Sequence, residues 1–250
     1  MLSILYKVLI KMRHIPNFIT SLNLAAGFIA IIFAANGDMV TASWLISAAM
    51  IFDFLDGFSA RLLKAYSAIG RELDSLADVI SFGVAPGLII YQMLNDSLSL
   101  FAPMNVNSDV LKTTVLLIIP VIMPVCAALR LAIFNIDSTQ ATAFKGLPTP
   151  ANALAVISVV LAGHYSQSII FSSLTGSPVF LIVFTVTLSL MMVSRIPLLS
   201  LKFSNLNVKG NEGRYIMAGL VLVSFAIFGI KAAPLIIPLY ILASFLSLLF

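Results

Sequence analysis

The sequence contains few charged residues. Only 10% of its 250 residues are Asp, Glu, Lys or Arg, whereas 60% are hydrophobic. Soluble domains carry about 25% charged residues, so the composition excludes an ordinary soluble protein and indicates an integral membrane protein. At roughly 20 apolar residues per spanning helix, we expect an all-α, polytopic membrane helix bundle with about eight transmembrane helices and no separate soluble domain.

Thiol and imidazole groups are also scarce. The single cysteine, Cys126, lies within an apolar run, and the two histidines, His14 and His164, are far apart in the chain. One cysteine cannot form an intrachain disulfide, and CxxC spacing for a zinc site is absent. We therefore interpret Cys126 as a small buried apolar residue. Neither histidine lies near other metal-ligating residues in the sequence, so we do not expect either to bind a metal.

Apolar runs divide the chain into candidate spans. They cover approximately 17–35, 40–62, 73–95, 111–135, 150–166, 176–194, 213–230 and 232–249. Residues 1–16 are basic and partly apolar, without a long apolar region that ends in a small-residue cleavage site. We expect this segment to be a short amphipathic interfacial segment, and residues 201–250 to form a loop and two additional transmembrane helices.

Lysine and arginine are distributed unevenly over the predicted loops. Of the 14 basic residues, 12 fall on one side: Lys7, Lys11, Arg13, Arg61, Lys64, Arg71, Arg130, Lys145, Arg195, Lys202, Lys209 and Arg214. Only Lys112 and Lys231 fall on the other. The positive-inside rule then predicts that both termini are cytoplasmic. The net charge is therefore a topology signal, not a sign of nucleic-acid binding, and it can attract anionic lipid headgroups.

Four aspartates interrupt the apolar pattern. Asp53 and Asp56 lie near the cytoplasmic end of the second span, and Asp74 and Asp78 near the start of the third. Residues three or four apart share a helix face. The loop between the two spans is short, so we expect an antiparallel hairpin in which all four carboxylates converge at one depth.

The predicted carboxylate cluster requires a counter-charge. Each acid near the membrane interior costs roughly 2.5–3.5 kcal/mol on insertion scales and is normally paired. Arg61 can offset one charge, whereas Arg71 is adjacent to Glu72 and contributes little net charge. Mg²⁺ and Mn²⁺ prefer oxygen ligands, so we expect one or two of these ions, and the sequence does not decide between the metals.

A structural role or a transport role for the aspartates stays open beside the metal site. In the structural role they would form an ion-pair network that only joins the helices, although the nearby arginines cannot balance four acids. In the transport role they would belong to a divalent-cation transporter, but transporter acids usually lie near the bilayer midplane beside broken helices. The small residues Gly57, Ser59, Ala60 and Gly70 either let a bulky ligand approach the backbone or let helices pack closely.

The aspartates are part of a longer spaced motif. From Asp53 the chain reads D-x-x-D-G-x-x-A-R, then eight residues, then G-x-x-x-D-x-x-x-D, which ends at Asp78. This motif resembles the signature of the CDP-alcohol phosphotransferases, and every fixed position of that signature is filled. Five further segments resemble the bacterial phosphatidylserine synthase branch: PNFITSLNLAAGFIA (16–30), SFGVAPG (81–87), ALRLAIFN (128–135), FKGLPTPANA (144–153) and MVSRIPLLSLK (192–202). One position departs from it, because Ile133 stands where a second arginine is expected.

The resemblance implies a reaction in which CDP-diacylglycerol and L-serine give phosphatidylserine and CMP. It implies that residues 17–200, about six helices, form the catalytic core, and that the enzyme is a homodimer in the inner membrane with its site facing the cytoplasm. It also implies roles for individual residues. The metal ligands would be Asp53, Asp56, Asp74 and Asp78, with Asp78 also the general base, and Gly57, Ala60 and Arg61 would lie against the CDP moiety.

Two more polar residues are candidate substrate ligands. Asn23, in the otherwise apolar first span, could contact the nucleotide or diphosphate, or bond to a neighbouring helix. Arg130, near the cytoplasmic end of the fourth span, could hold a phosphate or the serine carboxylate, or snorkel to the interface. A different acceptor, such as glycerol 3-phosphate or inositol phosphate, also stays open, and it would require more basic side chains around the acceptor pocket.

Overall fold

The computed structural model describes residues 2–101, 110–137, 144–166, 169–199 and 211–247. Side chains are described for residues 14–99, 114–137, 145–166, 169–199 and 211–247. Six of the basic residues used for the topology prediction lie outside these side chains: Lys7, Lys11, Arg13, Lys112, Lys202 and Lys209. Most of the amphipathic segment predicted for residues 1–16 lies outside them as well.

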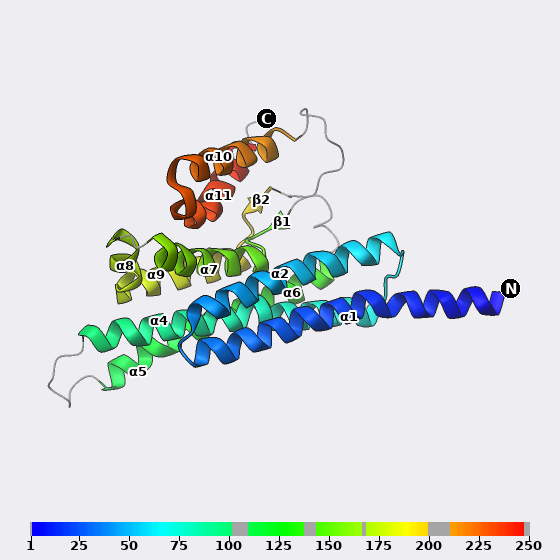
Figure 1. Cartoon of the computed structure of the whole chain (residues 1–250), viewed down its shortest axis with the longest axis horizontal. Helices are drawn as coiled ribbons and strands as arrows, with labels where there is room; N and C mark the ends of the chain where they lie inside the picture. The colour runs from blue at the N-terminus through cyan, green and yellow to red at the C-terminus, as the bar shows by residue number, and fades with distance from the viewer. Residues whose placement is uncertain (1, 102–109, 138–143, 167–168, 200–210, 248–250) are drawn as a thin grey trace.

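Helices account for almost all of the described structure, so the all-α prediction is confirmed (Figure 1). In chain order the elements are α1 (Leu2–Ala35), α2 (Met39–Leu62), α3 (Ala68–Asp78), η1 (Val79–Val84), α4 (Ala85–Phe101), α5 (Val110–Ile118), η2 (Ile119–Val121), α6 (Ile122–Ile136), β1 (Phe144–Lys145), α7 (Thr149–Ser166), α8 (Ile169–Thr175), α9 (Pro178–Val193), β2 (Pro197–Leu198), α10 (Glu212–Phe228), η4 (Gly229–Leu235) and α11 (Ile236–Leu246). α1 is continuous across residue 16, where the sequence predicted the end of a separate segment.

Several helices are long and apolar enough to cross a membrane. Among the described residues there are five, or six if the bent pair α8 and α9 counts as one span. They comprise His14–Ala35, Met39–Leu62, Ala68–Ser99, Thr114–Ile136 and Glu212–Leu246. α10 and α11, within the last of these, pack against each other (Figure 1). The chain is therefore a polytopic membrane protein, while the number of eight spans stays a prediction.

α1 and α2 form a tightly packed antiparallel pair. Small residues allow this approach, because Ala30 and Ala34 of α1 and Ala42 and Ala49 of α2 are fully buried. The turn between the helices places Gly37 at φ +83°, a conformation that glycine adopts at no steric cost. Asp38 then caps α2 by accepting a hydrogen bond from the Thr41 backbone N–H at 2.9 Å.

α1 also carries α3, so it is the common support of the segment that holds the aspartates. α2 and α3 each pack extensively on α1, whereas they make few backbone contacts with one another. The predicted α2–α3 hairpin is therefore corrected to a three-helix arrangement in which α1 bridges the other two. The connection from α2 to α3 turns at Lys64, with φ +49°, and Ser67 caps α3 by accepting from Gly70 N–H. Figure 1 shows this connection at the same end of the bundle as the N-terminus.

A two-stranded ribbon is the only sheet in the part of the chain that the structure describes, and the sequence did not predict it. β1 pairs antiparallel with β2, and the Gly146 backbone N–H donates to Ile196 O at 2.9 Å. A Cβ at Gly146 would lie 2.6 Å from the carbonyl oxygens of Met192 and Ser194, so only glycine fits at this turn.

α11 fastens the ribbon to the helices. The Tyr240 hydroxyl donates to Leu199 O at 2.9 Å, and the Leu199 backbone N–H donates to Ser244 Oγ at 3.0 Å. Both Tyr240 and Ser244 are buried. The residue that follows β2 therefore has both of its backbone polar groups bonded to one helix, α11.

Candidate active site

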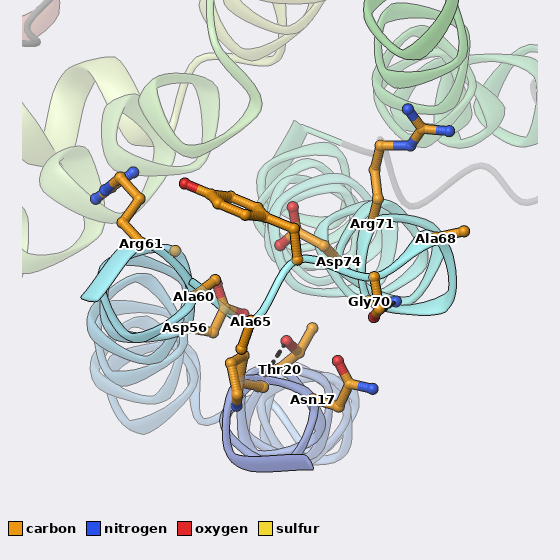
Figure 2. Close-up of a pocket in the computed structure, with 14 residues that line it drawn as sticks. Asn17, Thr20, Asp56, Ala60, Arg61, Ala65, Ala68, Gly70, Arg71 and Asp74 are labelled. Carbon is orange, nitrogen blue, oxygen red and sulfur yellow. Dashed lines mark hydrogen bonds between the residues drawn. The ribbon is translucent and has the colours of Figure 1, made fainter. Parts of the chain in front are cut away.

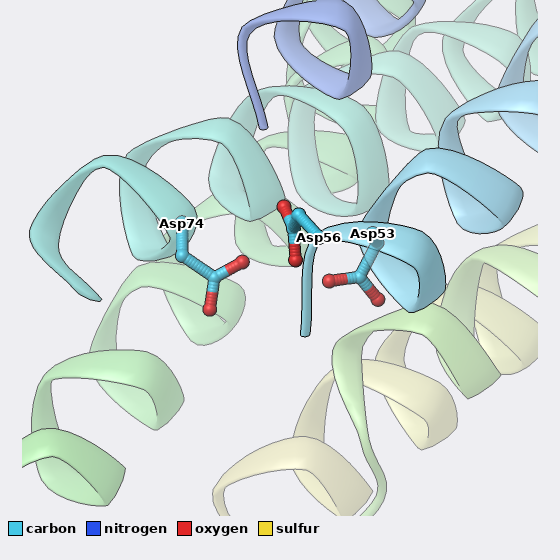
Figure 3. Close-up of side chains that lie close together, drawn as sticks. All are labelled: Asp53, Asp56 and Asp74. Carbon is cyan, nitrogen blue, oxygen red and sulfur yellow. The ribbon is translucent and has the colours of Figure 1, made fainter. Parts of the chain in front are cut away.

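Three of the four aspartates form a compact cluster. One carboxylate oxygen from each of Asp53, Asp56 and Asp74 lies within 4.8 Å of the other two. Figure 3 shows the side chains of Asp53 and Asp56 on α2 and that of Asp74 on α3 pointing toward one another. Asp56 is buried and the other two are half-buried. The convergence that the spacing predicted is confirmed for these three residues.

The cluster lacks neutralising partners within the described side chains. No Lys or Arg there forms an ion pair with the three carboxylates, and Asp56 Oδ2 and Asp74 Oδ1 are buried without a hydrogen-bond partner. Buried carboxylate oxygens without partners are costly. An all-oxygen donor set of this size fits a hard divalent cation such as Mg²⁺ or Mn²⁺. The residues present therefore match the group that the family signature implies.

Asp78 lies beside this cluster without belonging to it. The Asn23 side-chain Nδ2 donates to Asp78 Oδ1 at 3.4 Å, and both residues are buried. Asp78 is still close enough to interact electrostatically with Asp53 and Asp74. The four aspartates are thus divided into three that share a point in space and one that is held by an amide from α1.

A cavity of about 720 Å³ opens next to the cluster. Asp56 and Asp74 line it, together with Gly57, Ala60 and Arg61, the three residues that the resemblance places against the CDP moiety. Figure 2 shows Arg61 on α2 and Arg71 on α3 at two sides of this cavity. α1 contributes Pro16, Asn17 and Thr20, and the α2–α3 connection contributes Ala65, Tyr66 and Ser67.

The two motif glycines have different surroundings. A Cβ at Gly57 would meet only the Arg61 guanidinium, at 3.7 Å, which is ordinary contact, so this position is open to the cavity. A Cβ at Gly70 would lie 2.8 Å from Asn17 Oδ1 and 2.9 Å from Ser67 Oγ. Gly70 therefore permits close packing of α3 on α1, whereas Gly57 leaves room for a ligand.

The motif arginines also differ. Arg71 pairs with Glu72 at 3.6 Å, and both side chains are largely exposed. This pairing confirms the expectation that Arg71 contributes little net charge to the site. Arg61 is exposed at the cavity rim and has no carboxylate partner among the described side chains. Its guanidinium is therefore free to meet an anion in the cavity.

Arg130 and Asn23 lie away from the cavity lining, on the side of Asp78. Arg130 is only 8% exposed, its Nε has no hydrogen-bond partner, and it interacts electrostatically with Asp78 and Tyr240. Its helix is tied to α3, because Asn135 Nδ2 donates to Ser75 Oγ at 2.9 Å. Ile133, by contrast, is 47% exposed. The arginine expected at that position would not share the burial of Arg130.

Sequence reasoning missed Asn17, Thr20 and the residues of the α2–α3 connection as cavity-lining groups. A signal for the first two was present, because Asn17, Thr20 and Asn23 recur every three residues in a span that is otherwise apolar. Such spacing places them along one helix face. Nothing in the spacing of residues 63–67 indicated that the connection would fold over a cavity.

Comparisons with known proteins agree with this geometry. A family model described as CDP-alcohol phosphatidyltransferase matches residues 13–193. CDP-diacylglycerol–serine O-phosphatidyltransferase of Helicobacter pylori (strain ATCC 700392 / 26695) is 32% identical over 238 residues, which covers 94% of this chain and 91% of that protein. The matched region thus includes every aspartate of the cluster.

Two other relatives are matched over less of their length. CDP-diacylglycerol–serine O-phosphatidyltransferase of Mycobacterium leprae is 34% identical over 76% of this chain and 59% of that protein. Archaetidylserine synthase of Methanothermobacter thermautotrophicus is 35% identical over 61% of this chain and 60% of that protein. The chain therefore spans about three fifths of the length of these two relatives.

Proposed function

The chain belongs to the CDP-alcohol phosphatidyltransferase family, and from this membership we propose that it transfers the phosphatidyl group of CDP-diacylglycerol to the hydroxyl of L-serine, which gives phosphatidylserine and CMP. The observation that carries the proposal is the convergence of three carboxylates beside a cavity of about 720 Å³. A lipid donor fits a site in transmembrane helices, because its acyl chains can stay in the bilayer while its headgroup enters the cavity.

Asp53, Asp56 and Asp74 would hold the divalent metal, Mg²⁺ or Mn²⁺, as one ion or two, and Asp78 would add a ligand or act only as a base. When bound, the metal supplies positive charge that neutralises the diphosphate and the departing CMP. Arg61 acts on the same anion from the cavity rim, since a guanidinium can grip a phosphate through paired N–H donors. Gly57 and Ala60 leave space for the nucleotide beside these charges.

Asp78 is the proposed general base. The serine hydroxyl gives its proton to the Asp78 carboxylate while its oxygen bonds to the phosphatidyl phosphorus, and the bond from that phosphorus to the CMP oxygen breaks. Such proton transfer contributes roughly 10²–10⁴-fold to a rate. Asn23 keeps the carboxylate oriented by donating to Oδ1.

Arg130 is the proposed ligand of the serine carboxylate. A buried arginine with an unpartnered Nε is costly unless an anion completes its hydrogen bonds. Because Arg130 and Asp78 interact, a carboxylate held by Arg130 would bring the serine hydroxyl near the base. An acceptor with a phosphate would call for further basic side chains, and Arg130 is the one buried Lys or Arg among the described side chains.

We also propose an inner-membrane location, a cytoplasm-facing site and a homodimer. The N-terminus and the α2–α3 connection lie at one end of the bundle (Figure 1), the end to which the positive-inside rule assigns the cytoplasm. Serine and CMP are water-soluble, so a site at that end can exchange both with the cytoplasm while the lipid product remains in the bilayer.

An acceptor panel tests the function. Purified protein is incubated with Mn²⁺ or Mg²⁺, CDP-diacylglycerol and one alcohol at a time: L-serine, glycerol 3-phosphate, inositol phosphate or inositol. We expect CMP release with L-serine alone. Release with another alcohol would reassign the acceptor, whereas no release with any alcohol, together with metal flux into liposomes, would favour a transporter.

A further inference from the structure

The helix that carries Asp78 changes from α-helical to π-helical hydrogen bonding directly after that residue. α3 ends at Asp78, η1 is a π-helical segment over Val79–Val84, and α4 follows without a break. The Ala85 backbone N–H donates to Ile80 O, which is the i→i+5 pattern of a π-helix. Single π turns within α-helices are rare and occur frequently at functional sites. The direction of Asp78 therefore depends on what holds this turn.

Three other helices hold the π turn. From α1, Asn23 O accepts a hydrogen bond from Ser81 Oγ at 3.1 Å. A Cβ at Gly27 would lie 2.7 Å from Ser81 Cα, so α1 approaches the turn at backbone contact. On α6, Pro124 and Ala127 pack against Gly83, where a Cβ would lie 2.9 Å from Ala127 Cβ. These contacts leave the turn little freedom to relax into a regular α-helix.

From α7, one side chain donates a hydrogen bond to the turn. Asn152 Nδ2 donates to Phe82 O at 3.2 Å, and Asn152 is fully buried. Its own Oδ1 has no hydrogen-bond partner among the described residues. An apolar side chain at this position would avoid burying an unpartnered amide oxygen. The presence of a buried amide is explained if its N–H is needed to fix the π turn.

We propose that Asn152 is a positioning residue for catalysis: by holding Phe82 O it fixes the π turn and thereby the direction of the Asp78 carboxylate. The inference rests on the proposed role of Asp78 as the base. Asn152 lies outside the three-carboxylate cluster and is absent from the cavity lining, so it acts through the helix that bears Asp78 and not through substrate contact.

Kinetics with matched variants tests this role. Asn152→Ala removes the donor, and Asn152→Asp keeps the shape but places an oxygen against Phe82 O. A misplaced catalytic group lowers turnover strongly, so we expect kcat to fall about 10- to 100-fold, with little change in the KM values for serine and CDP-diacylglycerol. Ser158→Ala is the control, because Ser158 is buried on the same helix and donates only to Ala155 O; it should keep kcat.

A double variant shows whether the effect passes through Asp78. In an Asp78→Asn background, the further change Asn152→Ala should lower the residual rate by less than about twofold, because residues that act as a unit are non-additive. A full additional loss in that background, or unchanged kcat in both Asn152 single variants, would overturn the proposal.

Amide hydrogen exchange gives a readout that does not need activity. Loss of a buried hydrogen bond weakens local structure, so residues 79–84 of Asn152→Ala should exchange about tenfold faster than in Ser158→Ala. Equal exchange in the two variants would show that Asn152 does not hold the turn. If none of the alcohols in the panel led to CMP release by the unchanged chain, the proposed function would fail. The exchange experiment would still decide whether Asn152 fixes η1.

Discussion

Asn23 of α1 donates a hydrogen bond to Asp78 at the end of α3, with 3.4 Å between Nδ2 and Oδ1. This bond distinguishes Asp78 from the other three aspartates, whose carboxylates converge on one point with an unpartnered buried oxygen on Asp56 and on Asp74. In the proposed mechanism a metal binds to the group of three, while the fourth carboxylate accepts the proton of the incoming hydroxyl.

Asp78→Asn should abolish most turnover while the fold and most metal binding remain. The amide cannot accept the serine proton, and removal of a general base costs roughly 10²–10⁴-fold. Initial rates of CMP release and Mn²⁺ binding by electron paramagnetic resonance measure the two properties. A near-normal rate in this variant would remove Asp78 from the mechanism.

Single Asn substitutions of Asp53, Asp56 and Asp74 should weaken Mn²⁺ binding by at least about tenfold, since even outer-shell partners of a metal affect its affinity by 10–100-fold. Chelation with EDTA should stop CMP release in the unchanged chain, and added Mn²⁺ or Mg²⁺ should restore it. Unaltered Mn²⁺ titrations in all three variants would contradict the assignment of the cluster as the metal site.

Arg61→Ala should raise the KM for CDP-diacylglycerol by roughly tenfold or more and leave the KM for serine nearly constant. A hydrogen bond to a charged group contributes about 1.5–3 kcal/mol, and Arg61 lines the cavity beside Gly57 and Ala60. Arg61→Lys keeps the charge but loses the paired N–H donors of the guanidinium. Its KM for CDP-diacylglycerol should therefore lie between those of the unchanged chain and Arg61→Ala. Unchanged KM and kcat with CDP-diacylglycerol in Arg61→Ala would count against the proposal that Arg61 binds its phosphate.

Gly57→Ala should impair lipid-substrate binding without harming the fold. The new methyl meets nothing closer than 3.7 Å in the protein, and alanine is favoured over glycine in a helix by about 1 kcal/mol. Gly219→Ala on α10 is the control, because no atom lies within 4 Å of its new Cβ. Both variants should keep the thermal midpoint, and only Gly57→Ala should raise the KM for CDP-diacylglycerol. Equal kinetics of the two would show that the space beside Gly57 is not used.

Arg130→Met should raise the KM for serine about tenfold, because the ligand of the acceptor carboxylate is lost. Methionine has a comparable length and removes the buried charge, and a thermal melt would verify that the bundle still folds. Competition by serine analogues adds a second measure, since serine should lose its advantage over serine amide and ethanolamine, which lack the carboxylate, in this variant. A rise confined to the KM for CDP-diacylglycerol would make Arg130 a phosphate ligand instead.

Apolar runs and residue spacing were sufficient for most of the scaffold. The predicted span 40–62 agrees with α2 within one residue at its start, and the predicted 17–35 ends with α1. Helical periodicity predicted that Asp53 and Asp56 share a face, and the short loop between the spans predicted that Asp74 lies near them. These features depend on local repeat and on hydrophobicity, both of which the sequence displays directly.

Other features depend on partners that are distant in the sequence. The hydrogen-bond register after Asp78 is set by Asn23, Asn152 and the packing of Gly83, which no local pattern reveals. The ribbon likewise joins residues about 50 positions apart, and strands of two residues leave no periodic signal. The packing of both α2 and α3 against α1 could not be predicted, because the sequence does not show which apolar helix faces meet.

The attachment of Leu199 to α11 has a mechanical consequence. Since Tyr240 and Ser244 bind both backbone polar groups of Leu199, a displacement of α11 would also displace strand β2. Transmembrane helices tilt in response to the thickness of the surrounding bilayer. A change in the tilt of α11 would therefore act on β2 and β1, and through Gly146 on the start of α7, the helix that bears Asn152. Hydrogen bonds thus connect a helix within a candidate membrane span to the segment that precedes Asn152.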